Sequence, residues 1–263
     1  MLNKLLKYDL KYMIKNMGVF YVLAIIFSIV TRVFFSLDET FINVLLGQIS
    51  VGVMFSMIAS IIINTIMRSY VRFRDSIYKD EAYLTHTLPV TKAEIFESRF
   101  IETLVFSLLG FIVIIISLFI AYYTKDRYIL LKDSVNTLAG GLNINTVMFV
   151  LCILFILYLE LINIIQTGYL GLILGYGKNN AKIGHSLIYG FIIYVLSQGA
   201  LLLFIYIVGL FNSKVMDLFR NSITLDNSSI KLLLCLVIIF YSFIIFFINV
   251  ISVNTFNKGV NVE

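Results

Sequence analysis

Glu160 is the one acidic residue placed deep inside a hydrophobic run of this sequence. A carboxylate at the centre of a bilayer costs about 2.5 to 3.5 kcal/mol on insertion scales, so its side chain should face protein or water, or be protonated. Asn163 and Thr167 follow at i+3 and i+7 and share its helical face. Two interpretations stay open, a hydrogen bond between helices or contact with a transported solute. We favour the second, with Glu160, Asn163 and Thr167 along a substrate pathway.

A second polar stripe recurs every four residues in an earlier hydrophobic run. Small and hydroxyl side chains at this spacing let another helix approach closely and offer hydrogen bonds that lipid cannot provide. The stripe is explained either by packing or by a wall of the solute pathway, because Gln48 and Asn64 are larger than close packing needs. The candidate pathway residues in this run are Gln48, Ser56, Ser60 and Asn64, with Gly52 between them.

Nucleotide chemistry is not predicted for this chain. Gly177-Lys178 resembles a fragment of a phosphate-binding loop, but that motif needs Gly at position 172 and Ser or Thr at position 179. The chain has Leu172 and Asn179 there. We therefore expect the chain to bind no nucleotide or other cofactor itself.

Hydrolytic and metal chemistry are also not predicted. Cys152 and Cys235 lie inside hydrophobic runs, which favours buried thiols over a disulfide or a zinc site. His86 and His185 are isolated, and neither belongs to a His-Glu-x-x-His pair. The sequence predicts no catalytic residue, no metal site and no enzyme.

The composition indicates which elements position these residues. The chain has 263 residues, of which 60% are hydrophobic and 13% are charged, and its mean hydropathy is +0.98. This is more apolar surface than a soluble protein buries, so we expect an all-α, multi-pass membrane protein in one domain, residues 1–263. Spanning helices need roughly 20 apolar residues. Six runs qualify, about 18–36, 44–67, 100–123, 144–175, 183–211 and 230–253.

The basic residues predict the orientation. Most of the 20 Lys and Arg lie on one side of the six runs, and positive charge marks the cytoplasmic side. Both termini are therefore expected in the cytoplasm. The net charge of +5 fits attraction to an anionic leaflet, and nucleic acid is a poor explanation because no soluble module carries a basic stripe.

The segment 1–17 alternates apolar and basic residues at helical spacing. Lys4, Lys7, Lys11 and Lys15 fall on one side, and Asp9 interrupts the apolar side. We expect an interfacial helix over residues 1–17 that contacts membrane lipid. A cleaved signal peptide is disfavoured because no small-residue cleavage site follows the apolar stretch.

The segment 68–99 is the longest polar stretch between hydrophobic runs, and it contains the single proline, Pro89. Thr91-Lys92-Ala93-Glu94 forms a capping-box pattern, so a helix should begin after Thr91. Ahead of Pro89, residues 79–88 are long enough for a short, partly polar helix. The sequence thus predicts an ordered cytoplasmic loop with a short helix between two longer ones.

The part of this loop from Arg74 to Thr91 is similar to the first inner loop of the type-two ABC export permeases of Gram-positive bacteria. Its most specific part is Tyr83-Leu84-Thr85-x-Thr87-Leu88-Pro89-Val90. The resemblance implies a six-span permease in the bacterial plasma membrane that pairs with an identical or sister permease. It also implies that the N-terminal helix, here residues 2–17, is an elbow helix. It also implies two separate cytoplasmic ATPase subunits, which bind ATP and Mg²⁺.

In this family the short helix of the first inner loop couples the permease to the ATPase. Carried over to this chain, the coupling residues are Lys79, Asp80, Glu81, Tyr83, Leu84, Thr85, Leu88 and Pro89. The implied function is ATP-driven export of an amphipathic or hydrophobic substrate, such as an antimicrobial peptide or a lipid-like molecule. An ion-coupled carrier or channel that uses Glu160, and a sensor or assembly subunit that transports nothing, remain the alternatives.

Overall fold

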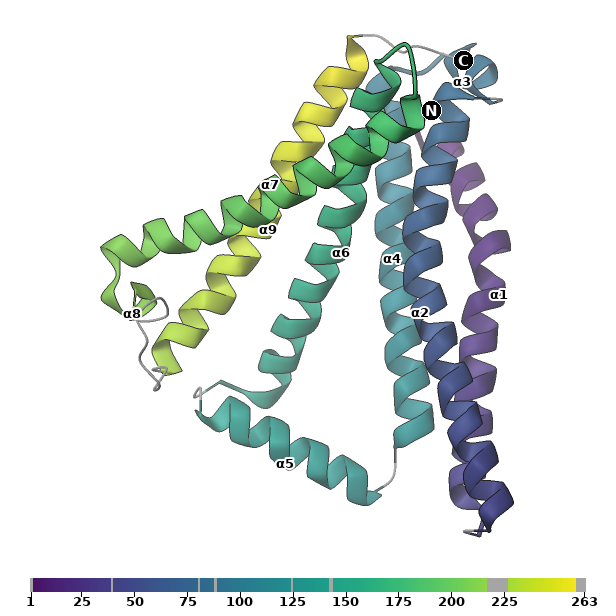
Figure 1. The fold of residues 1–263 in the computed structure, drawn as a ribbon, viewed down its shortest axis with the longest axis vertical. Helices are drawn as coiled ribbons and strands as arrows, with labels where there is room; N and C mark the ends of the chain where they lie inside the picture. Colours follow the sequence, from purple (N-terminus) through teal and green to yellow (C-terminus); the bar gives the residue numbers. More distant parts are fainter. Residues whose placement is uncertain are drawn as a thin grey trace. The chain divides into compact units, whose positions relative to one another are not determined.

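The structure, a computed structural model, describes residues 2–38, 40–79, 81–87, 89–123, 125–141, 144–216 and 227–258. Within these ranges the chain is helical, apart from short connections, and contains no strand (Figure 1). Six helices are long and apolar enough to cross a membrane. The expected all-helical fold with six apolar spans is therefore confirmed.

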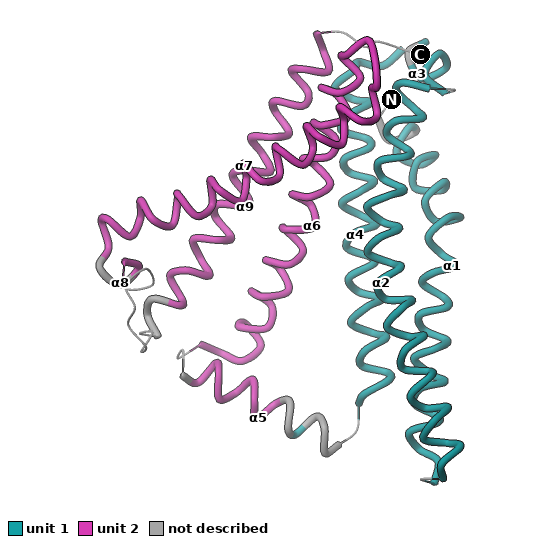
Figure 2. The backbone as a smooth tube through the Cα atoms, in the orientation of Figure 1, with its two compact units in different colours: residues 1–129 teal, residues 130–263 magenta. Residues whose placement is uncertain are grey.

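The described residues form six long helices and three smaller ones. Their bounds are α1 Leu2–Ser36, α2 Phe41–Tyr78, α3 Ala82–Thr87, α4 Lys92–Tyr122, α5 Lys125–Gly141, α6 Thr146–Tyr176, α7 Lys182–Phe211, α8 Ser213–Met216 and α9 Asn227–Asn257. The chain divides into two compact units, residues 1–129 and 130–263 (Figure 2). That the two units act together as one permease domain stays a prediction.

In the first unit, α1, α2 and α4 pack side by side (Figure 1). Met13 and Met17 of α1 are fully buried and form a cluster with Phe106 of α4. Farther along the bundle, Met54 and Ile58 of α2 form another buried cluster with Ala121 of α4. These contacts run along α1 and along the two helices, α2 and α4, that precede and follow the predicted coupling loop.

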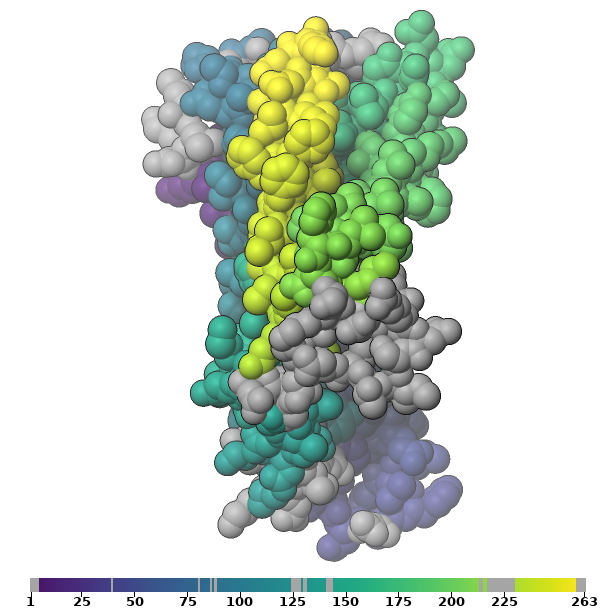
Figure 3. Space-filling view, turned by 90° about the vertical axis from the view of Figure 1, so that its left-hand side faces the viewer, coloured from purple at the N-terminus to yellow at the C-terminus, as the bar shows by residue number. Residues whose placement is uncertain are grey.

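In the second unit, α6 packs against both α7 and α9. The α6–α7 contact is very close: a Cβ atom added to Gly171 would lie 2.5 Å from the backbone nitrogen of Gly190. At Gly175 an added Cβ would lie 2.4 Å from the backbone nitrogen of Ser186. The spacing of Gly171 and Gly175 is typical of close helix packing, and the structure shows such packing. Figure 3 shows the side chains of α9, in yellow, beside the later part of α7, in light green.

Two features differ from the sequence predictions. The elbow helix was expected to end at Met17, but α1 continues without interruption from Leu2 to Ser36. No proline follows Met17 to end the helix. The buried Met13 and Met17 hold this part of α1 against α4. In addition, residues 125–141, which lie between the predicted apolar runs 100–123 and 144–175, form the helix α5, which hydropathy did not indicate.

Candidate functional site

The predicted loop contains the expected short helix and the expected cap. Residues Ala82–Thr87 form α3, and α4 begins at Lys92. The backbone nitrogen of Glu94 donates to the Thr91 hydroxyl at 3.2 Å, and the backbone nitrogen of Thr91 donates to the Glu94 carboxylate at 2.9 Å. This reciprocal pair is a capping box, which satisfies two backbone donors that the first turn leaves free.

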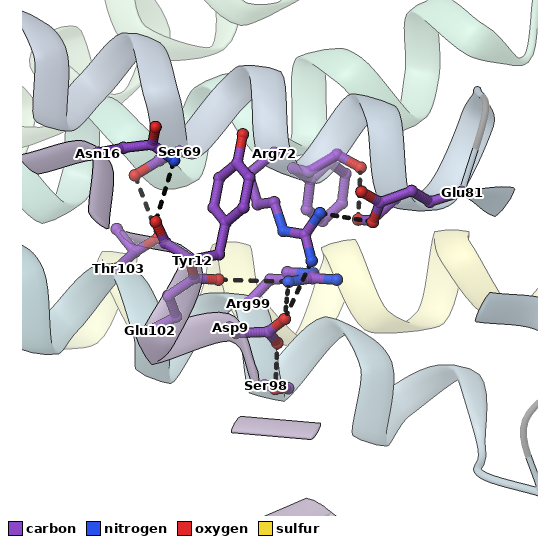
Figure 4. Close-up of polar contacts among 12 residues, drawn as sticks. Asp9, Tyr12, Asn16, Ser69, Arg72, Glu81, Ser98, Arg99, Glu102 and Thr103 are labelled. Atoms are coloured by element: carbon purple, nitrogen blue, oxygen red, sulfur yellow. Dashed lines mark hydrogen bonds and ion pairs between the residues drawn. The ribbon is translucent and has the colours of Figure 1, made fainter. Parts of the chain in front are cut away.

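A buried cluster of charges lies at the base of this loop (Figure 4). Asp9 of α1 is 2% exposed and accepts a hydrogen bond from the Ser98 hydroxyl at 2.8 Å. It also forms a close ion pair with Arg99 of α4, whose side chain is 4% exposed. A second arginine, Arg72 of α2, lies 3.5 Å from the same carboxylate. Asp9 thus joins the three long helices of the first unit.

Arg72 extends the cluster into the loop. Its Nη1 lies 2.5 Å from Oε2 of Glu81, the residue directly before α3. Its guanidinium also lies 4.4 Å from the centroid of the Tyr12 ring of α1, within the range of a cation–π contact. Because one arginine contacts Asp9, Tyr12 and Glu81, the start of α3 is tied to the buried face of α1.

The cluster contains a third acid, Glu102. It lies one turn after Arg99 on α4, with its carboxylate 3.4 Å from the Arg99 guanidinium. Nearby, the Thr103 hydroxyl donates to the Ser69 hydroxyl of α2 at 3.4 Å. Buried ion pairs gain strength from the low dielectric but cost desolvation, so such a cluster fixes the geometry of the helices and adds little net stability. In the sequence, only Asp9, which interrupts the apolar side of the N-terminal segment, indicated this cluster.

The two-turn helix α3 has one buried and one exposed side. Ala82 and Thr85 are buried, whereas Tyr83 is 70% exposed and Leu84 is 73% exposed. Among the other predicted coupling residues, Lys79 and Glu81 are partly exposed and Pro89 is exposed, and Asp80 and Leu88 lie outside the described residues. Two adjacent large apolar side chains on a polar loop form a surface that a partner protein can cover.

The predicted stripe on α2 is not the face by which this helix packs. Gln48 and Ser56 are exposed, and Ser60 and Asn64 are partly exposed. The hydroxyl of Ser56 donates to the Gly52 carbonyl, and the Asn64 amide donates to the Ser60 carbonyl, each at 2.9 Å. The buried face is a neighbouring one, made of Gly47, Ser50, Met54, Ile58, Ile61, Thr65 and Ser69. The packing interpretation of the stripe therefore fails within this chain, and its role in a pathway stays a prediction.

Glu160 of α6 accepts hydrogen bonds from two residues of α7. The Tyr194 hydroxyl donates to its Oε1 at 2.8 Å, and the Gln198 amide nitrogen donates to its Oε1 at 3.0 Å and its Oε2 at 3.3 Å. The hydroxyl of Tyr241, on α9, donates to the side-chain amide oxygen Oε1 of Gln198 at 3.2 Å. The partly exposed carboxylate of Glu160 therefore links α6 to α7 directly, and to α9 through Gln198.

The polar stripe of α6 continues beyond Glu160. Asn163 is fully buried and donates to the Ser197 hydroxyl of α7 at 3.1 Å, while the Thr167 hydroxyl bonds the Ile164 carbonyl of its own helix. Among the described residues, Oδ1 of Asn163 and both amide atoms of the fully buried Gln166 have no hydrogen-bond partner. The structure thus brings Glu160 and Asn163 to the α6–α7 interface and leaves Thr167 bonded locally.

Comparison of the chain with protein-family models, with curated proteins and with solved structures found no match. The features of the chain that bear on function are the two polar clusters and α3. Within the described part of the chain, no group of three or more His, Cys, Asp or Glu side chains could hold a metal ion.

The two cysteines are free thiols, and their burial differs from the prediction. Cys152 is half-buried, but Cys235 is exposed, so the prediction of a buried thiol is wrong for Cys235. The physical reason is that an apolar position in a membrane helix can face lipid, so hydrophobicity alone does not imply burial in the protein.

Proposed function

We propose that this chain is the transmembrane subunit of an ATP-driven ABC exporter in the bacterial plasma membrane, with both termini in the cytoplasm. Separate ATPase subunits bind ATP and Mg²⁺, and a second permease subunit, identical or sister, completes the transporter. The observation that carries this proposal is α3, which exposes Tyr83 and Leu84 while its base is held by the Arg72–Glu81 ion pair.

The contacts at the base of α3 support a coupling role. A motor protein that moves α3 must act on a rigid attachment, because a free loop would absorb the movement. Glu81 is joined to Arg72, and Arg72 is joined to Asp9, which pairs with Arg99 at the start of α4. Displacement of α3 would therefore act on α1, α2 and α4 together, and the capping box makes α4 begin at a defined residue.

The first test is co-purification of the affinity-tagged chain with an ABC ATPase subunit expressed in the same cells. Replacement of both Tyr83 and Leu84 by Asp should abolish co-purification and substrate-stimulated ATP hydrolysis, because two charges then occupy the apolar contact surface. The permease itself should remain inserted, since both side chains are largely exposed.

A matched control changes two exposed apolar residues of another polar helix. Ile129 and Leu138 of α5 are 46% and 60% exposed, and their double replacement by Asp should leave ATPase binding unchanged. Unchanged ATPase binding by the Tyr83/Leu84 variant, or equal loss in both double variants, would contradict the coupling role of α3.

The Glu160 cluster favours a second candidate, an ion-coupled carrier. A carboxylate that joins α6, α7 and α9 through neutral donors could exchange a cation during transport. Transport by the purified chain in vesicles distinguishes the candidates. Transport driven by an ion gradient without ATP would favour the carrier, and dependence on the ATPase subunit would favour the exporter.

A further inference from the structure

The hydrogen bonds around Glu160 all run toward its carboxylate. The Tyr241 hydroxyl donates to Gln198, and the amide nitrogen of Gln198 and the hydroxyl of Tyr194 donate to Glu160. Both carboxylate oxygens take part in these hydrogen bonds, and each side chain that contacts them is neutral.

The Glu160 carboxylate has no ion-pair partner among the described residues. The three side chains linked to Glu160, directly or through Gln198, are neutral, and the ion pairs of the described chain involve other acids. An unpaired carboxylate in an apolar helix is costly, and the cost falls when a cation binds. One turn further along α6, the buried Oδ1 of Asn163 also lacks a donor. The cluster therefore has an excess of acceptors and lacks a positively charged donor.

We propose that Glu160 binds the ammonium group of a cationic amphipath, an amine with an apolar chain. An ammonium supplies one positive charge and several N–H donors, which match the two acceptor oxygens of the Glu160 carboxylate. Glu160 is partly exposed, and Leu157, three residues earlier on the same helical side, is 52% exposed. An apolar chain can therefore lie along α6 while the amine meets the carboxylate.

This inference names a substrate class for the proposed exporter and takes its biological meaning from that proposal. The site itself rests only on contacts within the second unit. Binding can therefore be measured on the full chain alone, without an ATPase, so that the two proposals can fail separately.

The experiment measures binding of radiolabelled dodecylamine to the purified chain in phosphatidylcholine nanodiscs, with empty nanodiscs subtracted. Dodecanol, which has the same chain but no charge, is the comparison ligand. Wild type should bind the amine at least tenfold more tightly than dodecanol. Glu160→Gln should lose at least tenfold in amine affinity and leave dodecanol binding unchanged, because the amide keeps the shape and removes the charge.

Asp133→Asn provides the matched control variant. It removes an exposed carboxylate of α5 outside the Glu160 cluster, so amine affinity should stay within threefold of wild type. Equal amine binding by wild type and Glu160→Gln, or equal binding of amine and dodecanol by wild type, would overturn the proposal.

A second measurement needs no variant, which keeps the proposal testable if Glu160→Gln fails to fold. Dicyclohexylcarbodiimide modifies carboxyl groups in apolar surroundings, and mass spectrometry identifies the labelled peptide. Dodecylamine held at Glu160 should attack the activated carboxyl, so that the dodecylamide forms and dicyclohexylurea leaves, whereas dodecanol should leave only the acylurea label. Absence of the dodecylamide at Glu160 would refute the site. Amine binding through Glu160, together with failure of any ATPase subunit to co-purify with the chain, would support the site and contradict the exporter. Co-purification of an ATPase subunit without amine selectivity would do the opposite.

Discussion

Replacement of Asp9 by Asn should destabilise the first unit through loss of one buried charge. Removing one partner of a buried ion pair typically costs about 3 to 5 kcal/mol, because the other charge stays buried without compensation. Arg99 retains Glu102 at 3.4 Å, and the Asn oxygen can still accept from Ser98, so we expect the lower end, about 3 kcal/mol. For a chain of this size, that corresponds to a fall in Tm of roughly 6 to 12 °C.

The matched control is Glu81→Gln, which breaks the outer ion pair of the same arginine. The side chain of Glu81 is 46% exposed, so water replaces the lost interaction and the cost should be at most about 1 kcal/mol. Tm is measured on the full chain in detergent as the temperature at which half of the protein leaves the monodisperse size-exclusion peak. The Asp9 variant should melt well below the Glu81 variant.

A double-mutant cycle tests the pairing directly. If Asp9 and Arg99 stabilise each other, the loss in Asp9→Ala/Arg99→Ala should be smaller than the sum of the two single losses by about 0.5 to 3 kcal/mol. Equal Tm values for Asp9→Asn and Glu81→Gln, or strict additivity in the cycle, would refute the buried ion pair.

Two further predictions concern the packing of the second unit and the cap of α4. Gly171→Ala should destabilise the α6–α7 contact by about 1 to 3 kcal/mol, because the new Cβ would lie 2.5 Å from a backbone atom, while Gly199→Ala, where nothing lies within 4 Å, should be neutral or mildly stabilising. Equal Tm values for these two variants would contradict the close packing. Thr91→Ala should cost roughly 1 kcal/mol through loss of the cap and should accelerate hydrogen exchange over residues 92–96, so identical protection in both proteins would show that the cap is unimportant.

The features predicted well from the sequence depend on short stretches of chain. A membrane span needs only a continuous apolar run, so the six long helices were predictable from length and hydropathy. The capping box at Thr91 and Glu94 depends on residues three positions apart, and the close approach at Gly171 and Gly175 on residues four apart. In each case the sequence signal lies within one continuous stretch of the chain.

The predictions that failed involve helix ends set by tertiary packing. A helix was expected over residues 1–17 and a separate span from about Gly18, but the structure joins them in one helix, α1, whose Asp9, Met13 and Met17 are buried against neighbouring helices. Likewise α2 extends to Tyr78, about three turns beyond the predicted end of its apolar run. Hydropathy marks the apolar part of a helix and does not mark the polar turns that packing adds to it.

For each candidate site, the sequence indicated only one of the residues that are in contact. Glu160 was recognisable because an acid in an apolar run must be compensated. Its donors Tyr194 and Gln198 are 34 and 38 residues away on α7, and the separation between Asp9 and Arg99 is 90 residues. No local pattern specifies such partners, so Asp9 was recognised only as an interruption of an apolar face.

The balance of charge distinguishes the roles that we assign to the two clusters. In the first unit, Asp9, Glu81 and Glu102 are each within ion-pair distance of Arg72 or Arg99, so a ligand has little to gain there and much buried geometry to disturb. In the second unit, Glu160 is held only by neutral donors among the described residues, so a cation can gain from binding without displacing a resident partner. A compensated buried cluster favours a fixed connection between helices, and an uncompensated, partly exposed one favours a binding site. This difference is why we assign coupling to the base of α3 and substrate recognition to Glu160.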